Sequence, residues 1–186
     1  MSTGLPPIHS FNRHRRFGCA VLTLGWCAST LIGAESRADL AEATRALYQG
    51  DAPRAQLIAE AYRKAGKAAA GLTLVAETLA HAETTGECWW QAELCRLQGE
   101  LLLQTGGKRE MLEAEESFHL ALTVARRQQA KSLELRAAMS LSRLWQQQGK
   151  RVEARQLLAE VYGWFTEGFD TADLQEAKAL LAELAE

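Results

Sequence analysis

The residues of this sequence whose side chains could do chemistry are few and scattered. His81 and His119 each lack a Cys, Asp or His neighbour at metal-ligand spacing. The cysteines contain no CxxC pair and have no histidines at such a spacing; they are Cys19, Cys27, Cys88 and Cys95. The sequence therefore predicts no metal site and favours buried free thiols in a reducing compartment, with Cys88 and Cys95 on one helix.

Motifs for nucleotide or nucleophilic chemistry are missing as well. The sequence has no GxxxxGK[ST] loop, and Gly106–Lys108 lacks both a preceding strand and a following Ser or Thr. Ser140 and Ser142 show no His–Asp constellation. The acidic pair Glu115–Glu116 is typical of solvated helix surface. We therefore expect no catalytic residue and no cofactor, and a protein that is not an enzyme.

The elements that hold these residues are amphipathic helices, shown most clearly by Ala137–Val161. Gln146–Lys150 contains no apolar residue, and Gly149 can take the left-handed conformation that ends a helix. The residues on one predicted face are Ala138, Leu141, Ser142 and Trp145 before the glycine, and Ala154, Leu158 and Val161 after it. A helical hairpin of this kind cannot bury its apolar face alone, which predicts further copies.

The same spacing recurs along the chain. The matching positions are Val21, Leu24, Gly25, Ala28, Arg37, Ala41 and Thr44, and then Ala55, Ile58, Ala59, Tyr62, Gly71, Val75 and Thr78. Val21 and Ala55 are 34 residues apart, which is the period of a two-helix repeat. Arg37 fits this pattern poorly.

A further copy has Cys95, Gly99 and Leu102 on its first helix and Ala114, Phe118 and Ala121 on its second. Its small residues Gly99 and Ala114 are fifteen positions apart, whereas the corresponding Ser142 and Ala154 are twelve positions apart. The paired glycines of Thr105–Glu110 suit an enlarged turn, where we expect the three extra residues.

Residues 17–34 allow two interpretations. They form an uncharged apolar run after the basic cluster Arg13–Arg16, as in a secretory signal or anchor. They also keep the repeat register, which a signal peptide has no reason to do, and the repeat interpretation is therefore favoured. We expect residues 1–16 to be a disordered basic tail. If 17–34 is a signal, the protein is exported or membrane-anchored; otherwise it is cytoplasmic.

The C-terminal residues 170–186 predict a capping helix. Asp170 or Thr171 is a suitable N-cap, and Asp173 and Glu176 lie near the positive end of the helix dipole. The predicted apolar stripe is Leu174, Ala177, Leu181 and Leu184. A stack of hairpins must end on a helix that is apolar on one side only.

Length and composition agree with an all-α fold. The chain has 186 residues and only three prolines, and it has no sustained run of alternating β-branched residues. A formal net charge of −2 leaves no electrostatic footprint for binding DNA or RNA.

The pattern resembles the tetratricopeptide repeat over residues 17–168. Four segments, residues 58–66, 92–103, 125–165 and 166–184, are similar to the C-terminal repeat region of bacterial signalling proteins that combine a nucleotide cyclase with an AAA-type ATPase. The resemblance implies a right-handed α-solenoid of antiparallel hairpins with a C-terminal capping helix. The implied repeats are residues 17–50, 52–85, 88–128 and 132–165.

The resemblance also implies a binding groove, because the first helices of such repeats line a concave surface that holds peptides or partner helices. The implied groove residues are Glu60, Arg63, Lys64, Glu93, Arg96, Glu100, Arg136, Met139, Arg143 and Gln147. They differ from the Lys/Asn arrangement that chaperone cofactors of this family use to hold a terminal carboxylate. Trp89–Trp90 begin the next helix, and we expect one of them to pack on the previous hairpin. The other, where it is exposed, would mark a partner surface.

The function that follows is a non-catalytic interaction module, a scaffold or sensor in bacterial signalling. Its expected partner is a charged, hydrogen-bonding protein segment, with no nucleic acid involved. An alternative is the detached regulatory part of an ATPase–cyclase protein, whose catalytic domains would then be partners. A third is a secreted or membrane-anchored repeat protein.

Overall fold

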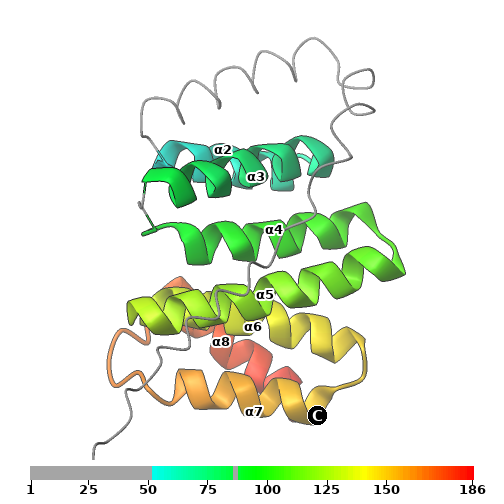
Figure 1. Cartoon of the computed structure of the whole chain (residues 1–186). Coiled ribbons are helices and arrows are strands. Elements are labelled where there is room, and N and C mark those ends of the chain that lie inside the picture. The colour runs from blue at the N-terminus through cyan, green and yellow to red at the C-terminus, as the bar shows by residue number, and fades with distance from the viewer. Residues whose placement is uncertain (1–51, 86–87) are drawn as a thin grey trace, which may run out of the picture. The chain divides into compact units, whose positions relative to one another are not determined.

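The computed structural model describes residues 52–85 and 88–186, and within these ranges the protein is entirely helical (Figure 1). The all-α prediction is confirmed for this part of the chain. The predicted tail 1–16 and first hairpin 17–50 lie outside the described residues and stay predictions. The helices are α2 (Ala52–Lys64), α3 (Ala68–Thr85), α4 (Gln91–Thr105), α5 (Lys108–Gln128), α6 (Lys131–Gln147), α7 (Arg151–Tyr162) and α8 (Ala172–Glu183).

Tight turns pair these helices into hairpins. Gly149 ends α6 with φ of 80°, and the N–H of Lys150 donates to the carbonyl of Trp145 at 2.8 Å. The turn between α2 and α3 repeats this geometry, with Gly66 at φ of 68° and the N–H of Lys67 on the carbonyl of Tyr62 at 2.9 Å. A left-handed residue lets the chain bond back to the last turn of the helix, and glycine takes this conformation without a steric penalty.

The enlarged turn predicted at Thr105–Glu110 is wrong. Only Gly106 and Gly107 lie between α4 and α5. The three extra residues lengthen the helices, since Ala114 is the seventh residue of α5, whereas Ala154 is the fourth residue of α7. The sequence Lys108–Met111 consists of good helix formers, which explains why it extends α5 by nearly one turn.

The hairpins stack so that each first helix contacts the next first helix. The pairs α2–α4, α4–α6 and α6–α8 are in contact, besides the pairs that follow one another in the chain. Within a hairpin, small residues let the two helices pack closely. Gly99 of α4 faces the ring of Phe118 on α5, and the hydroxyl of Ser142 on α6 donates to the carbonyl of Ala154 on α7 at 3.0 Å.

The core lies along the predicted helix faces. Positions such as Ala59, Cys95 and Leu141 are completely buried, and Phe118 is the largest fully buried side chain. Buried residues form one cluster from α2 to α4 and another from α4 to α8, and Leu79 packs on both.

The predicted stripe of α8 needs one correction. Leu174, Ala177 and Leu184 are buried as expected, but the fourth buried residue is Leu180, while Leu181 is only partly buried. Successive helical residues are about 100° apart, so two neighbours can both lie near one edge of a face.

Candidate functional site

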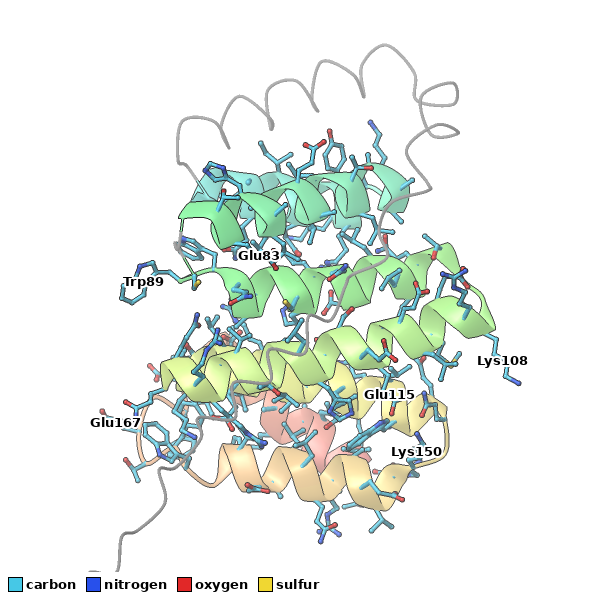
Figure 2. The ribbon with its side chains drawn as sticks, in the orientation of Figure 1. Glu83, Trp89, Lys108, Glu115, Lys150 and Glu167 are labelled. Carbon is cyan, nitrogen blue, oxygen red and sulfur yellow. The ribbon has the colours of Figure 1, made fainter. Side chains whose placement is uncertain are left out.

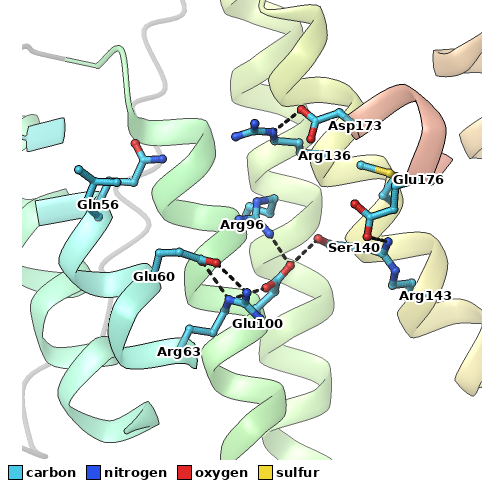
Figure 3. A pocket seen from close by; sticks show the side chains of 12 residues that line it. Gln56, Glu60, Arg63, Arg96, Glu100, Arg136, Ser140, Arg143, Asp173 and Glu176 are labelled. Atoms are coloured by element: carbon cyan, nitrogen blue, oxygen red, sulfur yellow. Dashed lines mark hydrogen bonds and ion pairs between the residues drawn. The ribbon is translucent and has the colours of Figure 1, made fainter. Parts of the chain in front are cut away.

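A cleft of about 470 Å³ lies across the exposed faces of α2, α4, α6 and α8 (Figure 3). Its walls combine charged side chains of both signs with the apolar groups of Leu57 and Met139. The complete lining is Gln56, Leu57, Glu60, Arg63, Arg96, Glu100, Arg136, Met139, Ser140, Arg143, Asp173 and Glu176.

Seven of the ten groove residues implied by the sequence resemblance line this cleft. They are Glu60, Arg63, Arg96, Glu100, Arg136, Met139 and Arg143. Gln147 lines a neighbouring depression of about 290 Å³ that shares Arg63, Glu100 and Arg143 with the cleft. The other two lie elsewhere: Lys64 is 70% exposed and pairs with Glu60 at 3.7 Å, and Glu93 is buried beneath the arginines.

At the α2–α4 end, Glu60 and Arg63 form one network with residues of α4. Arg63 donates to both oxygens of Glu60, at 2.9 and 2.7 Å, and lies 3.2 Å from Glu100. Arg96 bonds both oxygens of Glu93, at 3.0 and 2.7 Å, and also pairs with Glu100. Each carboxylate oxygen in this group therefore has an arginine partner.

These pairings favour the charged forms of Glu60, Arg63 and Arg96. The hydrogen bond from Arg63 lowers the pKa of Glu60, and the reverse contact raises the pKa of Arg63. Burial alone would lower the pKa of Arg96, but its bond to Glu93 and the nearby Glu100 outweigh burial and raise it.

At the α6–α8 end, two arginines of α6 each bond one carboxylate of α8. Arg136 Nε donates to Asp173 Oδ2 at 2.7 Å, and an Arg143 terminal nitrogen donates to Glu176 Oε1 at 2.6 Å (Figure 3). Between them Ser140 donates to Glu100 at 2.9 Å, which joins α6 to α4.

Sequence reasoning missed the role of Asp173 and Glu176, which it assigned to the helix dipole. The sequence did show that both residues lie on the polar side of α8, because they flank the buried Leu174 and Ala177. It did not identify their partners, because Arg136 and Arg143 lie 37 and 33 residues away in the sequence.

The other candidate residues serve packing. The thiol of Cys95 is buried, which raises its pKa to about 12. The prediction that Cys88 and Cys95 lie on one helix is wrong, because Cys88 precedes α4. His81 lies on α3, and His119 is exposed on α5 with its ring 5.8 Å from that of Trp145. Within residues 52–85 and 88–186, no group of three or more His, Cys, Asp or Glu is placed to hold a metal ion.

The prediction that Glu115 is simply solvated is wrong. Its carboxylate accepts hydrogen bonds from Trp145 Nε1 at 2.7 Å and Gln148 Nε2 at 3.1 Å, and pairs with Lys150 at 3.4 Å. Figure 2 shows Glu115 and Lys150 on neighbouring elements. Burial raises the pKa of Glu115, but these donors outweigh burial, and the net shift is downward. Glu115 therefore ties the lengthened α5 to the α6–α7 turn.

Of the paired tryptophans that precede α4, Trp89 is 81% exposed and points away from the helices (Figure 2). Trp90 packs against the cluster of α2 and α3. One tryptophan is thus packed, as expected, and the other is exposed. The use of Trp89 as a partner surface stays a prediction.

No protein-family model matches the chain, and no curated protein matches its sequence. No helix among the described residues has the length and apolar content that a bilayer crossing requires.

Proposed function

We propose that the protein is a non-catalytic interaction module that binds a protein segment in the cleft of α2, α4, α6 and α8. In this proposal the hairpins are tetratricopeptide-like repeats of a right-handed solenoid, and α8 is its cap. The observation that carries the proposal is the cleft itself, to which four successive first helices contribute side chains.

Three features support this proposal. The first helices contact one another in series, α2 with α4, α4 with α6 and α6 with α8. The repeat spacing places Ala59, Gly99 and Ser142 at equivalent buried positions of α2, α4 and α6. Helix α8 contacts both α6 and α7, as the first helix of a following hairpin would, and its exposed side continues the cleft.

The direct test compares partner capture by two doubly substituted proteins. Arg136→Ala with Arg143→Ala removes two cleft guanidiniums, each about 40% exposed. Substitution by glutamate is unsuitable, because it would place like charges against Asp173 and Glu176. The control, Arg109→Ala with Arg155→Ala, removes the same charge from exposed sites on α5 and α7 and also breaks one surface ion pair.

We expect the cleft variant to recover its partner from a lysate of the source organism with affinity lower by about tenfold or more, since exposed interface arginines are frequent hot spots. The control variant should recover it like the unmodified protein. Equal capture by both variants, at equal helicity, would show that the partner does not use the cleft.

A second candidate is the regulatory part of an ATPase–cyclase system, in which the cleft binds a catalytic domain. The four similar segments favour it, because residues 92–103 and 125–165 include Arg96, Glu100, Arg136 and Arg143 of the cleft. Co-expression with a cyclase or ATPase encoded next to this gene tests it. A complex that changes catalytic rate and dissociates with the cleft variant is the expected result.

A further inference from the structure

The two ends of the cleft differ in the hydrogen-bonding capacity that they leave open. At the α2–α4 end, each oxygen of Glu60, Glu93 and Glu100 already has an arginine partner. Arg96 is only 12% exposed and its fork is used on Glu93 and Glu100. Every carboxylate oxygen at this end therefore has an arginine partner. The network joins α2 to α4, and the bond from Ser140 to Glu100 joins α4 to α6.

At the α6–α8 end both ion pairs are made through a single hydrogen bond. Arg136 uses Nε on one oxygen of Asp173, and Arg143 uses one terminal nitrogen on one oxygen of Glu176. A guanidinium carries five N–H donors and a carboxylate has two acceptor oxygens. Among the described residues, the one further ion pair of these four groups joins Arg136 to Glu93 at 3.8 Å.

Each pair thus offers a partner both donors and an acceptor. The side chains are accessible, with exposed fractions of 41% and 31% for Arg136 and Asp173 and 39% and 57% for Arg143 and Glu176. A ligand group that matches such a pair accepts one hydrogen bond and donates another from the same side.

Charged ligand groups match these pairs poorly. A carboxylate would bond the arginine but bring a like charge toward Asp173 or Glu176. An ammonium would bond the carboxylate but bring a like charge toward Arg136 or Arg143. Hydroxyls and amides carry no charge and have both functions. A hydroxyl donates and accepts through one oxygen atom, whereas an amide has a donor atom and an acceptor atom side by side, which matches a subsite with a separate donor and acceptor.

The geometry of its donor and acceptor distinguishes a side-chain carboxamide from a backbone peptide unit. In a trans peptide unit the C=O and N–H point to opposite sides, so one unit cannot accept from the arginine and donate to the carboxylate together. In the primary carboxamide of Asn or Gln, the oxygen and one N–H lie on the same edge. This edge is what proteins use when Asn or Gln forms paired hydrogen bonds with a base.

We propose that Arg136–Asp173 and Arg143–Glu176 are two subsites for Asn or Gln side chains of the bound segment. This inference rests on the proposed function and names the partner's chemistry. Arg136 and Arg143 are seven residues apart on α6, or roughly 10 Å along the axis at 1.5 Å per residue. A segment in the polyproline II conformation has three residues per turn and rises about 3.1 Å per residue, so residues i and i+3 lie on one side of it, about 9 Å apart. The motif is therefore Gln-x-x-Gln or its asparagine equivalent.

The test uses three capped nine-residue peptides of alanine, whose centres are Gln-Ala-Ala-Gln, Glu-Ala-Ala-Glu and Lys-Ala-Ala-Lys. Each is titrated into the ¹⁵N-labelled, unmodified protein, and the arginine Nε–H signals of Arg136 and Arg143 are followed by NMR. We expect the glutamine peptide to shift these signals and to bind about tenfold more tightly than the charged peptides. Tighter binding of either charged peptide, or no shift with glutamine, overturns the inference.

Removal of one subsite provides the second arm. Arg143→Ala with Glu176→Ala deletes the donor and the acceptor of one pair together. The matched control, Arg109→Ala with Glu113→Ala, deletes an ion pair of α5 outside the cleft. We expect the subsite variant to bind the glutamine peptide about tenfold more weakly and the control to bind it like the unmodified protein. Equal binding by both variants, at unchanged helicity, contradicts the carboxamide subsite.

The two proposals fail in different ways. If the cleft variant loses its partner but the glutamine peptide does not bind, the interaction module stands and the carboxamide inference is wrong. If partner capture does not depend on the cleft at all, the proposed function is wrong.

Discussion

At the scale of single residues, Gly99 is the position of α4 against which the ring of Phe118 on α5 packs. A Cβ atom there would lie 2.5 Å from Phe118 Cε1, and the aromatic ring is fully buried and cannot move aside. We expect Gly99→Ala to lower the free energy of unfolding by about 2 kcal/mol, because overpacking outweighs the gain in helix propensity. Urea unfolding measures this.

Gly71→Ala is the matched control. Its Cβ would meet the end of the flexible Leu101 side chain at 2.8 Å. Leu101 is also fully buried, but a small change of its χ2 angle moves the methyl carbons, whereas an aromatic ring is rigid. The cost should therefore be lower than at Gly99, at about 1 kcal/mol. Equal losses at both glycines would mean that Phe118 is not the rigid wall that the structure indicates.

Glu115 predicts a dependence of stability on pH. Its pKa in the folded protein lies below the ordinary value of a glutamate, which the unfolded chain keeps. A lowered folded pKa stabilises the protein above the unfolded pKa, and this stabilisation is lost as the pH falls through the folded pKa.

We therefore expect Glu115→Gln to unfold about 1–2 kcal/mol more easily than the unmodified protein at pH 7, since charge-assisted bonds to Trp145 and Gln148 are weakened. The difference should shrink as the pH is lowered from about 5 to about 3. Exposed Glu116→Gln is the control. A difference that stays constant over this range would contradict the assignment.

The residue types on the buried faces were predictable from spacing, as Ala59, Cys95 and Leu158 show. The bonds of Glu115 were not. A carboxylate at a helix surface looks the same in the sequence whether it meets water or a tryptophan 30 residues further on.

At the scale of elements, α8 is held by a stripe that the spacing identified only in part. Leu180 is 4% exposed, whereas Leu181 packs at the edge of the core. We expect Leu180→Ala to cost about 2–3 kcal/mol and Leu181→Ala about 1 kcal/mol, because the cost follows the buried contact that is removed. Thermal unfolding of both variants checks the order, and the reverse order would support the predicted stripe instead.

The helix pairs themselves were predictable, because glycine at Gly66 and Gly149 marks the left-handed end of a helix. The length of α5 was not. Gly106–Gly107 would also permit a wide loop, and the choice depends on whether Lys108–Met111 finds contacts as a helix. Glu115, one turn further along, supplies such contacts with the α6–α7 turn.

At the scale of the whole described chain, stability should be local rather than uniform. The buried cluster of α2–α4 is separate from that of α4–α8. Leu74 is fully buried in the first cluster, and we expect Leu74→Ala to cost about 2–4 kcal/mol there. In stacked hairpins such a loss reaches mainly the neighbours.

Hydrogen exchange measures this directly. Protection should fall in α2, α3 and the start of α4 and stay unchanged in α7 and α8. Leu158→Ala, fully buried in the other cluster, should give the opposite pattern. Equal loss of protection in all helices after either substitution would show a single cooperative unit.

Seven of the ten groove residues that the resemblance implied line the cleft, but the charge arrangement of the cleft was not predicted. The bonds from Arg136 to Asp173 and from Arg143 to Glu176 join helices that are far apart in the sequence. All four cleft arginines pair with carboxylates of the chain itself; they are Arg63, Arg96, Arg136 and Arg143.

The buried thiol of Cys95 is an internal probe of how often α4 opens. It precedes Arg96, which lines the cleft, and a thiol with a pKa of about 12 hardly reacts while it stays buried. Cys88, only partly buried just ahead of the helix, is the faster internal standard. The rate at which an alkylating reagent modifies Cys95 reports how often α4 opens, and a segment seated in the cleft should slow that rate whatever its identity.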